Sequence, residues 1–236
     1  MTPTQIEPLY KIEITCLNCN ETFTTMRVRS KFKRTIKKDT DFCGYYQGVN
    51  PDHYIVRVCP NCGFAGTEHF SEKFTPEEKE DFKRKVTDRW QPKDFGRKRT
   101  GEDALECLKL ALLCAQIKQE SDKVISGILH HLAWEYRRQG KEEEERRFLR
   151  FALESYKRLY EIEPFDPHNV KLMYMIGELN RRLGEYNEAI RWFSLVVQDK
   201  KIMDSAMIRA SREQWALACE EWKEQLGKSF PKLNQT

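Results

Sequence analysis

Two short cysteine pairs constrain the fold of this chain more than any other feature. Cys16 and Cys19 are separated by two residues, and so are Cys59 and Cys62. This spacing lets both thiolates of a pair reach one metal ion at about 2.3 Å from a tight turn. Two pairs supply four ligands, the complete shell of a tetrahedral site. The sequence therefore predicts a structural zinc ion at these four cysteines, with no open position for catalysis.

The N-terminus and the cysteine usage favour a reducing compartment. Residues 1–7 have neither a basic region nor an apolar run, and no stretch approaches the roughly 18 apolar residues of a membrane helix. We therefore expect a cytoplasmic protein with no membrane partner. In such a compartment the paired cysteines favour metal ligands over disulfides, while a redox dithiol or free thiols are the alternatives.

Residues 1–74 have the pattern of a small zinc-ribbon-like domain. Apolar and polar residues alternate over 10–14 and again over 54–58, which is typical of half-buried strands, and each run leads into a cysteine pair. The 39 residues between Cys19 and Cys59 exceed the roughly 15–20 of compact four-cysteine sites, so an insert must leave the ribbon and return. We interpret Cys43, inside this insert, as a small buried residue, with a fifth metal ligand as the alternative.

A basic run follows the first cysteine pair. Seven of the twelve residues from Arg27 to Lys38 are Lys or Arg. We interpret the run as a solvated strand face that also offsets the negative thiolate centre. The alternative is a phosphate-contacting nucleic-acid surface formed by Arg27, Arg29, Lys31 and Lys33. The net charge of +4 is modest for a nucleic-acid binder.

Residues 75–100 are predicted to form a connecting helix and a linker. Thr75, Pro76 and Glu78 make a strong helix start, because Thr and Glu at this spacing form a capping box and Pro suits the first turn. The helix is expected to run to about Trp90. Pro92 and the glycine four residues later mark the linker, whose arginines at 97 and 99 we expect to be solvated.

Residues 101–236 have helical periodicity throughout. Apolar residues recur every three or four positions, and six helices are predicted, over 101–119, 122–139, 142–162, 167–183, 186–200 and 204–226. The sequence around Gly140 recurs around Gly184, an offset of 44 residues. The second copy, 177–193, resembles a tetratricopeptide repeat, with small residues where paired helices approach. The predicted fold class is thus α+β, a zinc-ribbon-like domain followed by an all-α helical-hairpin domain.

The resemblance to tetratricopeptide repeats implies a peptide-binding groove along the first helix of each pair. The groove would present mostly basic and aromatic side chains, which suit an acidic or carboxylate-bearing peptide. In this register its residues are His130, Trp134, Arg137, Arg138, Lys171, Tyr174, Glu178 and Arg181. Alternatively, the arginines are exposed cations that interact favourably with helix C-termini.

The second cysteine pair, its flanks and the insert together resemble an uncharacterised bacterial family. The matching motifs are Asp39-Thr40-Asp41-Phe42, Asn50-Pro51 and Cys59-Pro60-Asn61-Cys62-Gly63-Phe64-Ala65. The family is known as domain of unknown function 2225, and the resemblance spans nearly the whole chain. It implies a zinc-ribbon-like head and a tetratricopeptide-like tail, and it implies no activity.

These patterns favour a non-enzymatic adaptor that binds a protein or peptide partner. The alternative is a nucleic-acid-associated regulator that uses the basic head. The sequence contains no Gly-rich phosphate loop, no nucleophile elbow and no His-rich open metal site, and no small-molecule substrate site is identified. The carboxylates Asp39, Asp41 and Asp52 of the insert are the only cluster that suggests catalysis.

Overall fold

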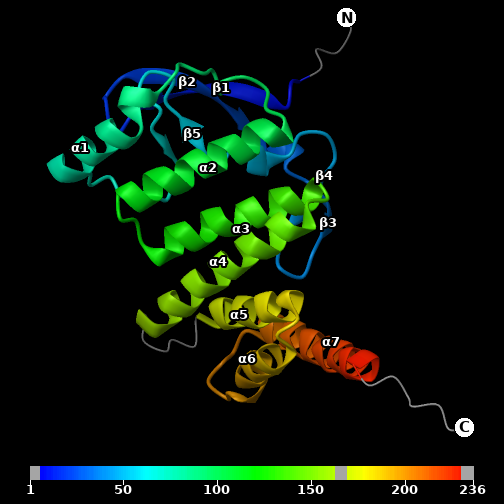
Figure 1. Ribbon diagram of the computed structural model, residues 1–236. Coiled ribbons are helices and arrows are strands. Elements are labelled where there is room, and N and C mark those ends of the chain that lie inside the picture. The colour runs from blue at the N-terminus through cyan, green and yellow to red at the C-terminus, as the bar shows by residue number, and fades with distance from the viewer. Residues whose placement is uncertain (1–5, 163–168, 230–236) are drawn as a thin grey trace, which may run out of the picture. The chain divides into compact units, whose positions relative to one another are not determined.

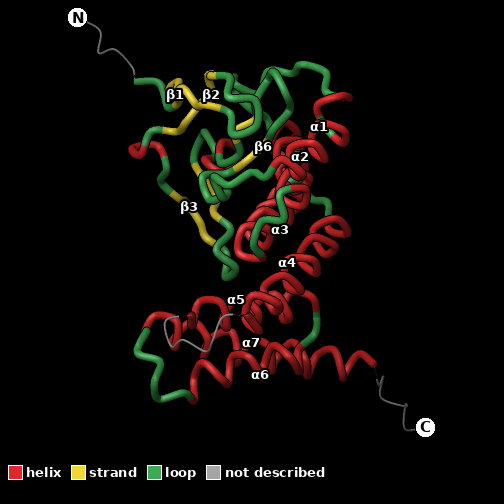
Figure 2. The backbone as a smooth tube through the Cα atoms, turned by 90° about the vertical axis from the view of Figure 1, so that its left-hand side faces the viewer, coloured by secondary structure: helices red, strands yellow, loops and turns green. Residues whose placement is uncertain are grey.

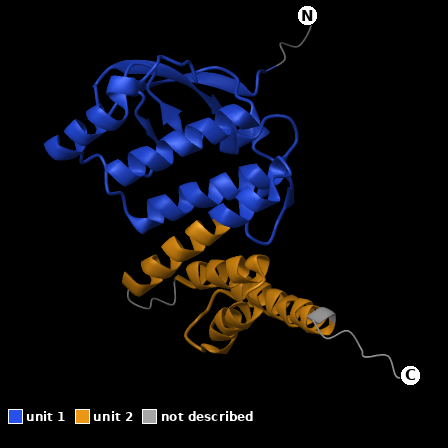
Figure 3. Cartoon of the chain, viewed as in Figure 1, with its two compact units in different colours: residues 1–148 blue, residues 149–236 orange. Residues whose placement is uncertain are grey.

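The computed structural model describes residues 6–162 and 169–229 (Figure 1). It confirms the α+β class, with small antiparallel sheets near the N-terminus followed by helices. The chain divides into two compact units, residues 1–148 and 149–236 (Figure 3). Within the described residues, no helix is both long enough and apolar enough to cross a membrane.

Three two-stranded antiparallel sheets are present in the described part of the first unit (Figure 2). The pairs are β1 (Leu9–Thr15) with β2 (Thr22–Val28), β3 (Thr35–Lys38) with β4 (Gly44–Tyr46), and β5 (Arg57–Val58) with β6 (Ala65–Gly66). The first cysteine pair lies in the turn between β1 and β2, and the second lies between β5 and β6. Each cysteine pair therefore joins two antiparallel strands, as the sequence predicts.

The predicted strand over residues 54–58 is mostly absent. Tyr54, Val56 and Val58 are buried as expected, but only the last two residues of this stretch form a strand. The preceding residues form a short 3-10 helix, Pro51–Tyr54. The side chain of Asn50 accepts a hydrogen bond from the Asp52 amide and so caps this turn. A capped start with proline in its first position favours a helical turn over an extended strand.

Capping boxes start two helices of the first unit. The Thr75 box starts α1 (Pro76–Lys85), and Thr100 with Asp103 starts α2 (Gly101–Ile117). Helix α1 ends at Lys85, earlier than the predicted end near Trp90. Val86 leaves helical geometry, and a 3-10 turn follows over Thr87–Arg89.

Helices α2 and α3 (Asp122–Arg138) pack into the same core as the cysteine pairs. Cys59, Phe82, Leu108 and Leu132 all belong to one buried cluster. The division of the structure therefore differs from the predicted segments 1–74, 75–100 and 101–236. A small β-rich head has too little apolar surface to form a stable core by itself. The apolar faces of α2 and α3 complete this core, so the two helices and the head form one unit.

The linker contributes a buried cation to this unit. Arg99, expected to be solvated, is 5% exposed. Its guanidinium donates hydrogen bonds to the backbone carbonyls of Phe95, His53 and Val56 at 2.7–2.9 Å. Several charge-assisted hydrogen bonds to carbonyls offset the cost of burying a guanidinium.

The second unit contains most of α4 (Glu142–Ile162) and all of α5 (Val170–Leu183), α6 (Tyr186–Gln198) and α7 (Ser205–Ser229). Gly177 of α5 lies against Phe193 of α6, so that a Cβ atom there would come within 2.8 Å of the ring. This is the close approach that the sequence predicts for the pair. Gly184, with φ of 85°, ends α5 in the left-handed conformation. The predicted helix start at 167 lies outside the described residues.

Candidate metal centre

The two cysteine pairs adopt the same backbone geometry. The carbonyl of Cys16 accepts a hydrogen bond from the Asn20 amide, and the carbonyl of Cys59 accepts one from the Gly63 amide, each at 3.0 Å. Asn20 and Gly63 both have positive φ angles, 59° and 77°. Asn and Gly tolerate this left-handed conformation better than other residues. The residue after each pair therefore lets the chain turn sharply and keep both sulfurs on one side.

The segment after α1 covers the second pair. The indole nitrogen of Trp90 donates a hydrogen bond to the Pro60 carbonyl at 2.8 Å, and Thr87 Oγ1 donates one to the Cys62 carbonyl at 3.2 Å. A Cβ atom on Gly63 would lie 2.6 Å from the Trp90 ring. Glycine at 63 therefore serves both the turn and the close approach of the indole.

The four sulfurs converge at one point in the core. Cys16 Sγ lies 3.6 Å from Cys62 Sγ, and Cys19 Sγ lies 3.7 Å from Cys59 Sγ. All four sulfurs lie within 4.8 Å of one another. Sulfurs bound at about 2.3 Å in a tetrahedron are about 3.8 Å apart, so the arrangement has the size of such a site. The cluster could hold one metal ion with all four ligands from the protein.

Burial and hydrogen bonding distinguish the four thiols. Cys16, Cys59 and Cys62 are buried, and Cys19 is partly exposed. A hydrogen bond from Cys16 lowers the pKa of Cys62 to about 5, while the same contact raises the pKa of Cys16. Burial raises the pKa of Cys59 to about 11. Since a bound metal requires thiolates, binding at this site must release protons.

Cys43 lies outside this cluster. It is fully buried, and its amide donates a hydrogen bond to Asp41 Oδ1 at 3.3 Å. Burial raises the pKa of its thiol to about 11. Its sulfur is not among the four that lie within 4.8 Å of one another. The structure places Cys43 as the small buried residue of the first interpretation and not as a fifth ligand.

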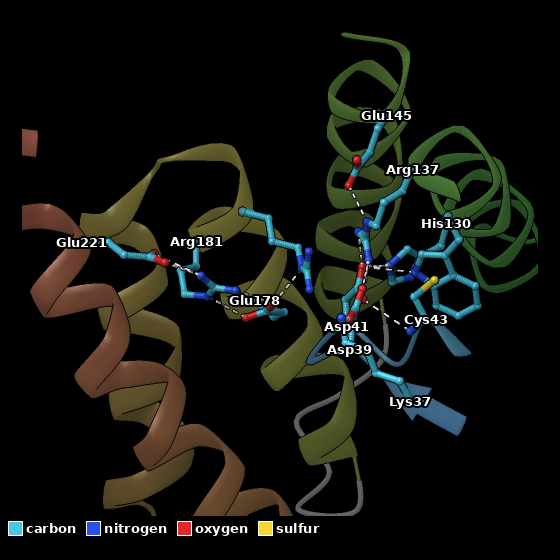
Figure 4. Close-up of polar contacts among 12 residues, drawn as sticks. Lys37, Asp39, Asp41, Cys43, His130, Arg137, Glu145, Glu178, Arg181 and Glu221 are labelled. Carbon is cyan, nitrogen blue, oxygen red and sulfur yellow. Dashed lines mark hydrogen bonds and ion pairs between the residues drawn. The ribbon is translucent and has the colours of Figure 1, made fainter. Parts of the chain in front are cut away.

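The predicted groove residues of α3 are engaged by the insert between the cysteine pairs (Figure 4). Arg137 pairs with Asp41 through both terminal nitrogens, at 3.0 and 2.6 Å, and with Asp39 at 3.0 Å. The indole nitrogen of Trp134 donates to Asp41 Oδ2 at 3.1 Å, and His130 Nε2 lies 3.5 Å from the same oxygen. These side chains therefore hold the insert rather than line an open groove.

Arg138 binds the insert beside them. It donates to Asp52 Oδ2 and, at 2.9 Å, to the Gly44 carbonyl, and it pairs with Glu135 at 3.1 Å. The three carboxylates that suggested catalysis are thus all paired with arginines of α3. Burial raises the pKa of Asp39, but hydrogen bonds from Tyr45, Lys37 and Arg137 outweigh it and lower that pKa overall.

The groove residues of α5 are also mostly occupied within their own unit. Arg181 pairs with Glu178 at 2.9 Å and with Glu221 of α7 at 2.8 Å (Figure 4). Glu178 and Tyr174 are buried, whereas Lys171 is exposed. Of the four predicted groove residues in this unit, Lys171 is the exposed one.

The basic residues of the nucleic-acid alternative are all exposed, namely Arg27, Arg29, Lys31 and Lys33. Arg27 lies 3.8 Å from Glu68. Arg29 donates from Nε to the Glu7 carbonyl at 3.2 Å and lies over the Tyr10 ring. All four cations remain exposed despite these contacts, so the basic stretch is accessible.

The arginine–carboxylate network is the feature that sequence reasoning missed. Asp41 and Arg137 are 96 positions apart, and no local pattern relates them. A signal was present in the composition of the two segments, since the insert carries Asp39, Asp41 and Asp52 and the end of α3 carries two adjacent arginines. The resemblance to tetratricopeptide repeats placed the arginines in an open groove, with exposed helix-end cations as the alternative, and neither interpretation includes contacts with a distant insert.

The comparisons with known proteins identify a family. A family model described as an uncharacterized protein conserved in bacteria, DUF2225, matches residues 9–218. The chain belongs to this family. No curated protein and no solved structure matches.

Proposed function

We propose that this DUF2225 protein is a non-enzymatic adaptor of the cytoplasm, in which a structural zinc ion stabilises the first unit and the helical second unit binds a protein or peptide partner. The observation that carries the proposal is the closed set of four cysteine sulfurs in the core. Four protein ligands leave no position for a substrate or an activated water. A metal bound there stabilises the fold.

The donor set supports zinc. Four thiolates at tetrahedral spacing suit Zn²⁺ or iron, and zinc is the usual ion of structural four-cysteine sites. The residues that would hold it are Cys16, Cys19, Cys59 and Cys62. Because these residues belong to the core that also contains Phe82 and Leu108, metal binding would contribute directly to folding of the whole unit.

The exposed apolar side chains support a partner for the second unit. Its large exposed apolar residues are Phe151, Ile162, Leu195, Met203, Leu217 and Leu226. Met203, between α6 and α7, is 86% exposed. Exposed apolar side chains on paired helices favour docking of another chain. The tetratricopeptide-like packing of Gly177 against Phe193 is consistent with such a role.

Two measurements test the two parts of the proposal. Native mass spectrometry should find one zinc ion per chain, and a chelator should remove it with loss of folded structure. Iron in its place, or a metal-free chain that folds normally, would contradict the structural zinc. This experiment does not depend on the identity of the partner.

For the adaptor, photo-crosslinking residues at positions 171 and 217 should capture the same partner, while one at exposed Leu113 of the first unit should not. Lys171→Glu with Leu217→Glu should abolish capture, and Lys200→Glu should preserve it, because Lys200 is an exposed lysine outside the predicted groove. Equal capture by all variants would overturn the assignment of the partner surface.

The exposure of the basic stretch favours one alternative, a nucleic-acid-associated regulator. Reversing Arg27, Arg29, Lys31 and Lys33 to Glu would then weaken RNA or DNA binding and reduce its salt dependence. The matched control reverses four exposed cations of the second unit, Lys200, Lys201, Arg209 and Arg212. Binding that is independent of salt, or equally weakened by both sets, would exclude this alternative.

A further inference from the structure

A pocket of about 660 Å³ opens in the first unit. Its walls are the β1–β2 hairpin, the segment 51–57, the loop 67–69 and the N-terminal half of α3. Pockets of this volume commonly hold ligands of cofactor or metabolite size. The metal centre does not contribute any of its cysteines to this lining.

The charged side chains that line the pocket are mostly cationic. Arg27, Lys33, Arg57 and Lys123 contribute four positive charges, and Glu68 contributes one negative charge. Glu68 lies 3.3 Å from Arg57 and 3.8 Å from Arg27, so it is shared by these two arginines. Lys33 and Lys123 make no ion pair with any residue that the structure describes. The pocket therefore has uncompensated positive charge that suits an anion.

Apolar side chains form the rest of the lining. They include Ile12, Met26, Val28, Ile55, Val124 and Ile128. Val28 and Ile128 are almost fully buried, and Tyr54, another lining residue, is also buried. An inorganic anion would leave this apolar surface without a partner. An organic anion would place its apolar body there and gain the corresponding free energy of transfer.

Gly127 keeps the helical wall of the pocket open. It lies in the middle of α3, where glycine costs about 1 kcal/mol of helix stability relative to alanine. A Cβ atom at this position would have no heavy atom within 4 Å. The mid-helix glycine of α5 differs, because Gly177 makes room for Phe193. No neighbouring side chain of the described protein requires glycine at 127, so space for a ligand is the physical reason that fits.

Two polar features of α3 also lack partners at the pocket. The Nδ1 atom of His131 is buried and has no hydrogen-bond partner among the described residues, although His131 lines the pocket. The N-cap residue Ser121, also in the lining, makes no side-chain capping hydrogen bond at the start of α3. A buried polar atom usually has a partner, and helix N-termini attract anions.

We propose that this pocket binds a small organic anion, phosphorylated or carboxylated, whose charged group contacts Lys33 and Lys123 and whose apolar body lies against Val28 and Ile128. This site goes beyond the proposed adaptor function and does not depend on it. It also gives Lys33, an exposed residue of the basic stretch, a role in binding a small molecule.

The test uses the full-length protein and the fluorescent probe 1-anilinonaphthalene-8-sulfonate, an anion with an aromatic body. We expect saturable binding of one probe per chain. Gly127→Leu should abolish it by filling the pocket, whereas Gly127→Ala should bind within about twofold of wild type. Lys33→Ala with Lys123→Ala should weaken binding about tenfold by removing two cations. The double variant keeps the test informative if Gly127→Leu does not fold.

Competition then distinguishes the sources of the anion. Displacement by adenosine monophosphate and not by octanoate assigns a phosphorylated ligand, and the reverse assigns a carboxylate. Sodium chloride at matched ionic strength should displace little of the probe. The proposal is overturned if folded Gly127→Leu binds the probe as wild type does, if the lysine variant is unaffected, or if neither organic anion competes.

Discussion

Both terminal nitrogens of Arg137 bind the carboxylate of Asp41, Nη1 at 3.0 Å from Oδ1 and Nη2 at 2.6 Å from Oδ2. The Asp41 side chain is completely buried, and the Arg137 side chain is 12% exposed. Phe42, the next residue, has a positive φ of 69°. The backbone thus turns sharply at the point where the carboxylate enters the unit. This pair fixes the insert onto α3 and occupies the place where a groove was expected.

Removing one partner of this pair should be costly. Asp41→Ala leaves the Arg137 guanidinium buried without its main counter-ion, and we expect a loss of about 3–5 kcal/mol in the free energy of unfolding. Arg137→Met combined with Asp41→Leu should recover most of that loss, because it removes both charges. Urea titrations, monitored by circular dichroism, measure the free energy of unfolding of the single and the double variant. Asp81→Asn in α1 is the control, since its ion pairs are at the surface. An equal effect of Asp41→Ala and Asp81→Asn would disprove the structural role of the buried pair.

Metal content should follow the four clustered cysteines alone. Cys59→Ser and Cys62→Ser should each lose the metal and lower the melting temperature, because a hydroxyl is a poor ligand for a structural zinc. Cys43→Ala should retain one metal per chain, since Cys43 lies outside the cluster. Elemental analysis of purified variants gives the stoichiometry. Loss of metal in Cys43→Ala would show that the four clustered cysteines are not sufficient to bind the metal.

The residues that follow the two cysteine pairs should respond differently to substitution. Gly63→Ala places a Cβ atom 2.6 Å from the Trp90 ring and forces alanine to a φ of 77°, so we expect a loss of about 1–3 kcal/mol in stability and weaker metal binding. Asn20→Gly keeps the left-handed turn and should change stability by about 0.5 kcal/mol or less. Chelator competition and thermal melting measure the two quantities. The expectation fails if both substitutions have equal effects.

Two helical glycines should give opposite results when changed to alanine. Gly127→Ala should stabilise the protein by about 1 kcal/mol, because alanine favours the helix and its Cβ atom meets nothing. Gly177→Ala should destabilise it by about 1–3 kcal/mol, because the Cβ atom would lie 2.8 Å from the buried Phe193 ring. The denaturation midpoint of each variant, compared with that of the wild type, gives the sign of its effect on stability. The same sign in both would mean that helix propensity outweighs packing at 177.

Stability should fall as the pH falls below about 6.5, partly through His131. Burial lowers the pKa of His131 to about 4, and the neighbouring His130 and Arg138 act in the same direction while Asp52 opposes them. Between pH 6.5 and 4 the unfolded chain therefore binds a proton that the folded chain does not, which costs up to about 3 kcal/mol. His131→Asn should reduce this pH dependence, and His69→Asn, at an exposed histidine, should not. Unfolding titrations at pH 7 and 5 compare the three proteins.

Local sequence patterns predicted the elements well where neighbouring residues decide the conformation. The capping boxes of Thr75 and Thr100 depend on a residue three positions away, and both helices start there. The alternation over residues 10–14 likewise lies within strand β1. Spacing also identified the four cysteines, since two residues between thiols constrain a pair before any tertiary fold exists.

The sequence by itself thus determined the helices, the two cysteine turns and their capacity to share a metal. The tertiary structure decided which surfaces remain available. Arg137 and Arg138 have the same helical register whether they face solvent or carboxylates of a distant insert, and Arg99 has the same sequence context whether exposed or buried. The pocket beside Gly127 is formed by segments more than 100 positions apart, from Ile12 to His131. Periodicity reports how a residue lies relative to its neighbours in the chain, whereas pairing and cavities depend on contacts between remote segments.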